Sequence, residues 1–71
     1  MNNLLENLKL LRKEKNLSQR DVAKALDIHF VNYNRYENGS HQIPLEILIK
    51  LADFYDISLD ELVGRNEKYY R

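Results

Sequence analysis

The sequence contains no cysteine, only one proline and two glycines in 71 residues, and just two histidines, His29 and His41. Without cysteine there is neither a disulfide framework nor a thiolate metal site, and the two histidines are too far apart for zinc-ligand spacing. We therefore expect no metal and no cofactor. No nucleophile stands beside a base, and two glycines are too few for a glycine-rich phosphate loop, so we do not expect an enzyme.

Long hydrophobic runs are absent as well. Charged residues interrupt the opening segment, MNNLLENLKLLRKEK, and it shows no small-residue cleavage site. The sequence therefore predicts neither a signal peptide nor a membrane span. We expect a soluble, cytoplasmic protein that is associated with the nucleoid.

Net charge is missing too, since eleven basic residues balance eleven acidic ones. The two halves of the chain nevertheless differ, because residues 1–35 carry seven basic and four acidic side chains, a net +3, while residues 36–71 carry −3. A dipolar chain of this kind can present a positive face to phosphate. A solvated surface with a chance asymmetry explains the same distribution, and charge alone leaves both interpretations open.

What the sequence does contain is a succession of apolar residues at helical spacing, with no strand alternation, repeat or low-complexity segment. A chain of this length supports one domain with a modest core. We expect an all-α domain over residues 1–64 and a tail, residues 65–71, without a clear assignment. The spacing and the breaks predict five helices, at about residues 3–15, 18–27, 29–38, 44–55 and 58–64.

Several of these helix ends are marked by capping residues. Ser18 with Asp21 resembles a capping box at the start of the second helix, and Ser58 with Glu61 forms a proper one before the fifth. Pro44 suits the first turn of the fourth helix. These signals make the boundaries more specific than the apolar spacing alone.

The third helix is separated from the second by only Asp27 and Ile28, so it must project at a steep angle, as the DNA major groove requires. On a wheel of about 100° per residue it divides into two halves. Both halves carry bulky apolar groups, so periodicity alone does not say which one is buried. One half contains Phe30, Val31, Asn34, Arg35 and Asn38, and the other contains Asn32, Tyr33, Tyr36 and Glu37.

The run LRKEKNLSQRDVAKALDIHFVNYNRYENG, followed by PLEILIKLADFYDISLDELVG, resembles the five-helix DNA-binding domain of the lambdoid phage repressor and Cro family. The likeness covers about residues 4–64 and rests on LSQ, YENG and SLDEL at that family's spacing. It implies that the second and third helices form a helix-turn-helix. It also implies that Tyr33 and Tyr36 lie in the core, so that the half with Phe30 and Val31 faces outward.

The resemblance further implies contacts to DNA phosphates. They would come from Gln19, at the start of the second helix, and from the end of the third helix and the loop after it, at Asn38, Ser40 and His41. Alternatives without a DNA contact stay open for two of these residues. Gln19 is then a solvated residue of the first turn, and Asn38 only ends the helix.

Arg12 and Glu37 match a pair that, in repressors of this family, forms a salt bridge between the first helix and the end of the third. Such a bridge would hold the recognition helix in place and would leave part of the guanidinium for phosphate. Two separate surface charges are the alternative. If the bridge forms, Arg12→Ala is expected to weaken stability and DNA binding together.

Base reading would fall to four residues of the outward half, which are Phe30, Val31, Asn34 and Arg35. Arg35 suits guanine O6 and N7, and Asn34 suits adenine. Phe30 and Val31 suit thymine methyl groups, which predicts an A·T-containing half-site. Alternatively, this apolar pair is buried or contacts another protein.

Some positions depart from the family pattern. His29 replaces the usual Ser or Thr before the third helix and caps poorly, and Asp27 replaces a frequent Gly. Ile43, Ile47 and Phe54 stand where the family tends to have polar or small residues, so we expect some exposed apolar surface there.

Together these features favour a small sequence-specific transcriptional regulator, a dimeric repressor that binds a double-stranded DNA operator. The family commonly dimerises through its C-terminal region, and a disordered tail is the alternative. An antitoxin with a toxin partner is a close variant, and a protein-interaction module that uses the Phe30/Val31 surface is an alternative from another class. The expected homodimer contact consists of Leu59, Val63, Tyr69 and Tyr70.

Overall fold

The computed structural model describes residues 4–64, and within them the chain is entirely helical apart from turns and short connections. The helices run in the order α1 (Leu4–Glu14), α2 (Gln19–Leu26), α3 (Phe30–Asn38), α4 (Leu45–Tyr55) and α5 (Leu59–Val63). The all-α, five-helix fold expected from the sequence is confirmed. No helix of residues 4–64 combines the length and the apolar character needed to cross a lipid bilayer.

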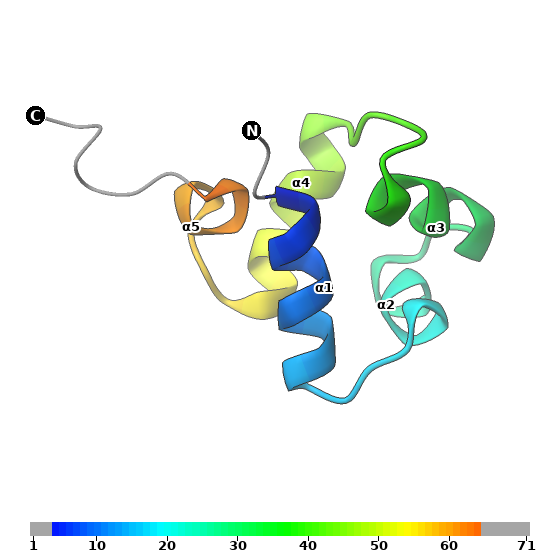
Figure 1. Ribbon diagram of the computed structural model, residues 1–71, viewed down its shortest axis with the longest axis horizontal. Helices are drawn as coiled ribbons and strands as arrows, with labels where there is room; N and C mark the ends of the chain where they lie inside the picture. Colours follow the sequence, from blue (N-terminus) through cyan, green and yellow to red (C-terminus); the bar gives the residue numbers. More distant parts are fainter. Residues whose placement is uncertain (1–3, 65–71) are drawn as a thin grey trace, which may run out of the picture.

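Helix α1 lies in the middle of the molecule, with α5 on one side and the α2–α3 pair on the other (Figure 1). Its contacts with both α3 and α5 show how it joins the two sides. Helix α4 contacts α2 and α5, so it closes the bundle on the opposite side of the core. The α2–α3 pair therefore rests on two helices and leaves its remaining surface free.

All five helices contribute to a single hydrophobic core. Its fully buried side chains include Leu8 of α1, Val22 of α2, Tyr33 of α3, Leu51 of α4 and Leu62 of α5. Removing such side chains from water is the main favourable contribution to folding, at roughly 25 cal/mol per Å² of apolar surface. The core holds α2 and α3 against the rest of the bundle.

Local hydrogen bonds define the helix ends as the sequence predicts. Ser18 and Asp21 form a complete capping box before α2, and Ser58 and Glu61 form the other before α5. At the far end of α1, Asn16 has a left-handed backbone with φ of 58°. Asn tolerates this conformation better than most residues, so it ends the helix at little cost.

Gly39 ends α3 with φ of 86°, a conformation that residues with a Cβ adopt only with strain. A Cβ at this position would also lie 3.1 Å from Cδ1 of Leu5 on α1. The glycine thus allows both the left-handed turn and the close approach of α1 to the end of α3. This turn starts the loop that leads to α4.

The fourth helix differs from its predicted form in three ways. Pro44 precedes it with extended ψ of 150°, so α4 begins at Leu45 and not at the proline. The helical spacing of Leu45, Leu48 and Leu51 predicts one apolar stripe, yet Leu45 is 65% exposed, since it lies at the first turn of the helix. Ile47 was expected to be exposed and is buried, because it lies one turn before Leu51 on the face that packs into the core.

Ile43 and Phe54 are the other two residues at which we expected exposed apolar surface. Ile43 is half-buried, so it packs against the core and still leaves part of its apolar surface exposed. Phe54 is exposed as expected, and its ring forms a T-shaped contact with the ring of Tyr55 at a centroid distance of 4.9 Å.

Candidate nucleic-acid interface

The connection between α2 and α3 consists of Asp27, Ile28 and His29. Asp27 has left-handed φ and ψ of 58° and 48°, and its backbone N–H reaches the carbonyls of Ala23 and Lys24. The N–H of Ile28 bonds to the carbonyl of Ala23 at 3.0 Å, which completes a tight helix stop with Asp where Gly is more common. His29 precedes α3 without any side-chain capping bond, consistent with its poor capping ability.

The two halves of α3 differ sharply in burial. Tyr33 and Glu37 are fully buried, and Tyr36 packs half-buried against the core. Val31 is 53% exposed on the opposite side. Asn32 shares the wheel half of Tyr33 but is exposed, because it lies at the margin of the buried face.

Three of the other outward residues also reach the surface. Arg35 and Asn38 are exposed, and Asn34 is half-buried beside α2. Phe30 does not follow this pattern, since it is half-buried and packs against the core. Helical side chains lean toward the N-terminus of their helix, so the ring of this first residue lies back over the preceding turn. The expectation that Phe30 is simply outward-facing is therefore wrong.

Arg12 of α1 and Glu37 of α3 form a salt bridge. Nε and Nη2 of Arg12 donate to the two carboxylate oxygens of Glu37 at 3.0 and 2.8 Å. The guanidinium also donates through Nη1 to the carbonyl of Leu17 at 3.1 Å. The side chain of Arg12 is 13% exposed and that of Glu37 is 0% exposed, so this bidentate pair is largely shielded from water.

Glu37 accepts two further hydrogen bonds. Oε1 accepts from Nε2 of Gln19 at 3.0 Å, and Oε2 accepts from the hydroxyl of Tyr33 at 2.7 Å. Burial alone would raise the pKa of Glu37, but the hydrogen bonds from Arg12, Tyr33 and Gln19 outweigh it and hold the pKa below its ordinary value. The hydrogen bond to Glu37 likewise raises the pKa of Arg12. The pair is therefore ionised inside the protein.

Two tyrosines flank this carboxylate. Desolvation, followed by the hydrogen bond to Glu37, raises the pKa of Tyr33 far above its ordinary value. Burial, followed by the negative charge of Glu37, raises the pKa of Tyr55 to about 12. Within residues 4–64 the buried Tyr55 hydroxyl has no hydrogen-bond partner, in contrast to that of Tyr33.

A chain of polar side chains continues from Glu37 to the surface. The carbonyl oxygen of the Gln19 amide accepts from Nδ2 of Asn34 at 2.9 Å, and Oδ1 of Asn34 accepts from Nδ2 of Asn38 at 3.4 Å. Oδ1 of Asn38 in turn accepts from the backbone N–H and the hydroxyl of Ser40, at 2.8 and 2.6 Å. This chain ties the start of α2 to the C-terminal half of α3 and to the loop after it.

The predicted phosphate-contacting residues are thus brought together on one side of the molecule. Three of them, Gln19, Asn38 and Ser40, belong to the polar chain, and each makes hydrogen bonds within the protein. The sequence predicts the participants but not their mutual bonds. The amide side chains of Gln19 on α2 and Asn34 on α3 are a sequence signal for such bonds. Whether they pair depends on the angle between the two helices, which the sequence does not give.

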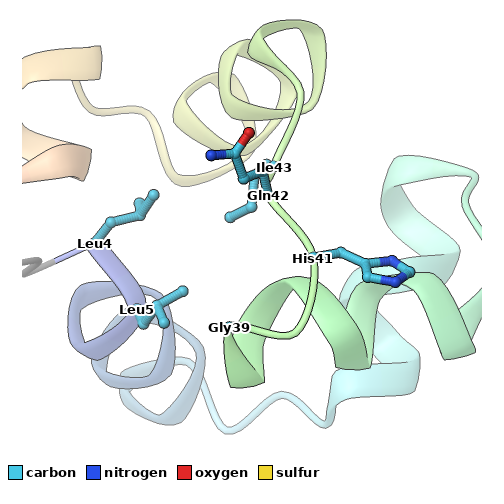
Figure 2. Close-up of a pocket in the computed structure, with 6 residues that line it drawn as sticks. All are labelled: Leu4, Leu5, Gly39, His41, Gln42 and Ile43. Carbon is cyan, nitrogen blue, oxygen red and sulfur yellow. The ribbon is translucent and has the colours of Figure 1, made fainter.

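His41 lies in the loop between α3 and α4. Its backbone N–H donates to the carbonyl of Arg35 at 3.2 Å, which folds the loop back against α3. The loop also borders a pocket of about 310 Å³ that Leu4 and Leu5 of α1 line from the other side. In Figure 2 the imidazole points away from these leucines and toward the α2–α3 side.

The expected dimer contact lies on α5 and beyond. Leu59 is 37% exposed and Val63 is half-buried. Tyr69 and Tyr70 lie outside the described residues. The separation between α5 and the α2–α3 pair (Figure 1) leaves both surfaces accessible at the same time.

Comparison with known proteins agrees with this geometry. A helix-turn-helix family model matches residues 8–62, which include α2, α3 and most of the remaining bundle. The chain belongs to the helix-turn-helix family, and the predicted resemblance is confirmed.

Its relatives include bacterial and phage regulators. The chain is 42% identical over 64 residues to the HTH-type transcriptional regulator AnsR of Bacillus subtilis, covering 90% of this chain and 55% of AnsR. It is 40% identical over 60 residues to the cryptic phage CTXphi transcriptional repressor RstR of Vibrio cholerae, covering 84% of this chain and 54% of RstR. The chain thus corresponds to slightly more than half the length of these relatives.

A solved structure has the same fold. The crystal structure of a transcriptional regulator from Listeria innocua superposes with a TM-score of 0.84 at 33% sequence identity, over 94% of this chain and 63% of that one. The arrangement of the five helices is therefore shared with a regulator of known structure.

Proposed function

We propose that this chain is a transcriptional repressor that binds double-stranded DNA as a dimer and places α3 in the major groove. The observation that carries the proposal is the outward half of α3, where Val31, Arg35 and Asn38 are exposed while the inward half is held by a buried polar network. A recognition helix has to be both accessible and fixed in orientation, and this one is both. The names of AnsR and RstR, a transcriptional regulator and a transcriptional repressor, support the assignment.

Within this proposal, three side chains of α3 read bases. Arg35 contacts guanine, Asn34 contacts adenine, and Val31 contacts a thymine methyl group. Val31 is the most exposed apolar group of the helix, so it is available for this contact. Phe30 is half-buried and packs against the core, so it is not among the side chains assigned to base reading.

Phosphate contacts come from the polar chain and from the loop after α3. Gln19, Asn38, Ser40 and His41 occupy one side of the molecule around the N-terminus of α2 and the C-terminus of α3. The bonds of Ser40 to Asn38 and of Asn34 to Gln19 hold these amide and hydroxyl groups in place before DNA arrives, which reduces the entropy lost on binding. Polar groups held in this way position a protein on the DNA backbone without reading sequence.

The unit that binds DNA consists of residues 1–64, and a second copy joins through α5 with Leu59 and Val63, together with the tail at residues 65–71. Such a dimer brings two recognition helices to half-sites about one helical turn apart. A repressor of this kind acts in the cytoplasm, at the nucleoid.

Affinity for a labelled mixed-sequence duplex, measured while salt is raised, tests the proposal. A phosphate-dominated binder loses affinity with a log–log slope of about −0.9 for each phosphate neutralised. Selection from random duplexes then tests base reading, and enrichment of thymine at one position is expected. The matched variants are Arg35→Gln, which is expected to weaken binding, and Lys9→Gln, which removes one charge from an exposed site on α1.

The exposure of Val31 also favours a second function, a protein-interaction module that uses this surface. A toxin is one candidate partner. Undetectable binding to the mixed duplex at low salt, with Val31→Glu abolishing capture of a purified protein partner, would favour this function over DNA binding.

A further inference from the structure

Arg20 of α2 and Phe30 of α3 form a stacked pair that the sequence pattern does not predict. The central guanidinium carbon of Arg20 lies 4.2 Å from the centroid of the Phe30 ring. At this distance the positive charge is attracted by the electron-rich ring face. The pair bridges the second residue of α2 and the first residue of α3 across the tight turn between them.

The ring is a fixed platform for this charge. Phe30 is half-buried and packs against the hydrophobic core, so its position is set by the fold. Arg20 itself is exposed. Stacking therefore restrains a long and otherwise mobile side chain without removing its charge from water.

Stacking leaves the hydrogen-bonding edge of the guanidinium available. A guanidinium carries five N–H donors, and its contact with the face of the Phe30 ring uses none of them as a hydrogen bond. Within residues 4–64, no hydrogen bond or ion pair engages the Arg20 side chain, whereas Arg12 uses its donors on Glu37 and Leu17. The fold thus holds a full set of charged donors in place and supplies no acceptor for them.

We propose that Arg20, held over the face of the Phe30 ring, contacts a DNA phosphate. The inference rests on the proposed function, because it places a further contact in the same interface. The N-terminal residues of a recognition helix lie closest to the base edges, and Phe30 is the first residue of α3. A charge stacked on this ring consequently lies at the wall of the groove, where phosphates are found.

A phosphate fits better than a base because α2 carries the guanidinium. In a helix-turn-helix the first helix crosses the sugar-phosphate backbone while the second enters the groove. Planar guanidinium donors match the paired oxygens of a phosphate. The same stack changes the role of Phe30, whose covered ring face supports Arg20 instead of contacting a thymine methyl group.

The test compares Arg20→Gln with Lys9→Gln on the mixed-sequence duplex, since both remove one positive charge from an exposed side chain. Arg20→Gln is expected to make the log–log salt slope shallower by about 0.9 per protomer and to lower affinity about fivefold near physiological salt. Random-duplex selection with Arg20→Gln is expected to return the wild-type consensus. If the wild-type protein binds DNA and Arg20→Gln shows the same salt slope as the wild type, the proposal is overturned.

A loss of affinity confined to duplexes with a guanine at one position would also overturn it, because Arg20 would then read a base. Failure of the proposed function has a different signature, which is the absence of binding by the wild-type protein itself. The two failures are thus distinguishable in one experiment.

Phe30→Leu tests the platform. It keeps an apolar side chain against the core but removes the ring, so Arg20 keeps its charge and loses its support. Binding is expected to weaken less than in Arg20→Gln, and the double variant is expected to bind no worse than Arg20→Gln alone. Thermal unfolding of Phe30→Leu checks that the domain stays folded, and strictly additive losses would contradict the stacked arrangement.

Discussion

On its inward side α3 carries Tyr33 and Glu37, both fully buried and hydrogen-bonded to each other, whereas on its outward side Val31 and Arg35 are exposed. The inward side contains a charged residue in the core, and the outward side contains an apolar residue in water. A buried charge costs free energy unless it is paired, whereas a single exposed apolar side chain is common on protein surfaces. The buried charge is therefore the feature of this helix that packing alone does not explain.

The buried carboxylate explains the inward side. Hydrophobic contacts are non-directional, so an apolar side chain at this position would permit small rotations of α3. The carboxylate of Glu37 accepts bonds from α1, α2 and α3 at the same time, through Arg12, Gln19 and Tyr33. Directional bonds from α1 and α2 to this residue of α3 define one orientation of the helix, and the outward side can then vary without moving it.

The largest expected effect comes from removing Arg12, the α1 partner of the buried Glu37 on the inward side of α3. Arg12→Ala leaves the buried carboxylate of Glu37 without its counter-charge, and such a loss typically costs about 3–5 kcal/mol of unfolding free energy. The neighbouring exposed Lys13→Ala is the control and is expected to change stability by less than about 0.5 kcal/mol. Urea unfolding measures both variants.

DNA binding is expected to weaken together with stability in Arg12→Ala. Adding Glu37→Gln to this variant removes the uncompensated charge and is expected to restore part of the lost stability. Equal losses for Arg12→Ala and Lys13→Ala would show that the bridge does not orient α3.

Acidification breaks the same bridge reversibly. The pKa of Glu37 is below its ordinary value of 4.5 in the folded protein, so its stabilising effect is complete above that value and is lost as the pH falls through the folded-state pKa. The expected loss is smaller than for Arg12→Ala, because a protonated carboxyl still forms hydrogen bonds. Urea unfolding over an acidic pH series measures it.

Glu37→Gln is the control for this series. Asp21 also has a lowered pKa, from its bonds to the backbone and side chain of Ser18, and it adds to the acid sensitivity of both proteins. The wild type is therefore expected to lose more stability on acidification than Glu37→Gln does. If the unfolding free energies of the two proteins fall in parallel with pH, Glu37 does not cause the acid sensitivity.

A smaller effect is expected from the two buried hydroxyls. Tyr33→Phe removes a donor to the charged Glu37, and hydrogen bonds to charged groups contribute about 1.5–3 kcal/mol. Tyr55→Phe removes a hydroxyl without a partner in residues 4–64, so it is expected to be neutral or stabilising. The melting temperatures of the two variants give the comparison directly, and a reversed order would contradict the network.

The smallest effect on stability is expected on the outward side. Val31→Ala shortens a side chain that is 53% exposed, so unfolding free energy is expected to change by less than about 0.5 kcal/mol. Binding to duplexes selected by the wild type is expected to weaken, because a thymine-methyl contact is lost. Unchanged selection by Val31→Ala would exclude this residue from base reading.

The sequence predicts the helices and their ends well for a physical reason. Capping boxes at Ser18 and Ser58 are formed within three residues, and the left-handed stop at Asn16 is also local. Resemblance to the repressor and Cro family adds the pairing of Arg12 with Glu37, which are 25 residues apart. No local pattern contains that pairing.

Other features could not be predicted because they depend on how far each helix is rotated. Ile47 was assigned to the surface by family comparison, yet α4 turns this residue into the core. Gln19 was expected to bind phosphate, and the structure shows that its amide also joins Glu37 to Asn34. Both outcomes follow from contacts between helices and not from spacing within one.

The sequence by itself determined an all-α chain with a helix-turn-helix, the residues that end each helix, and the set of side chains available on α3. The tertiary structure decided how deeply each of them is buried, and that Phe30 lies against the core beneath Arg20. The physical reason is one of range. Helix ends depend on hydrogen bonds between near neighbours, whereas burial and stacking depend on the angle at which α2 and α3 cross, which the whole core sets.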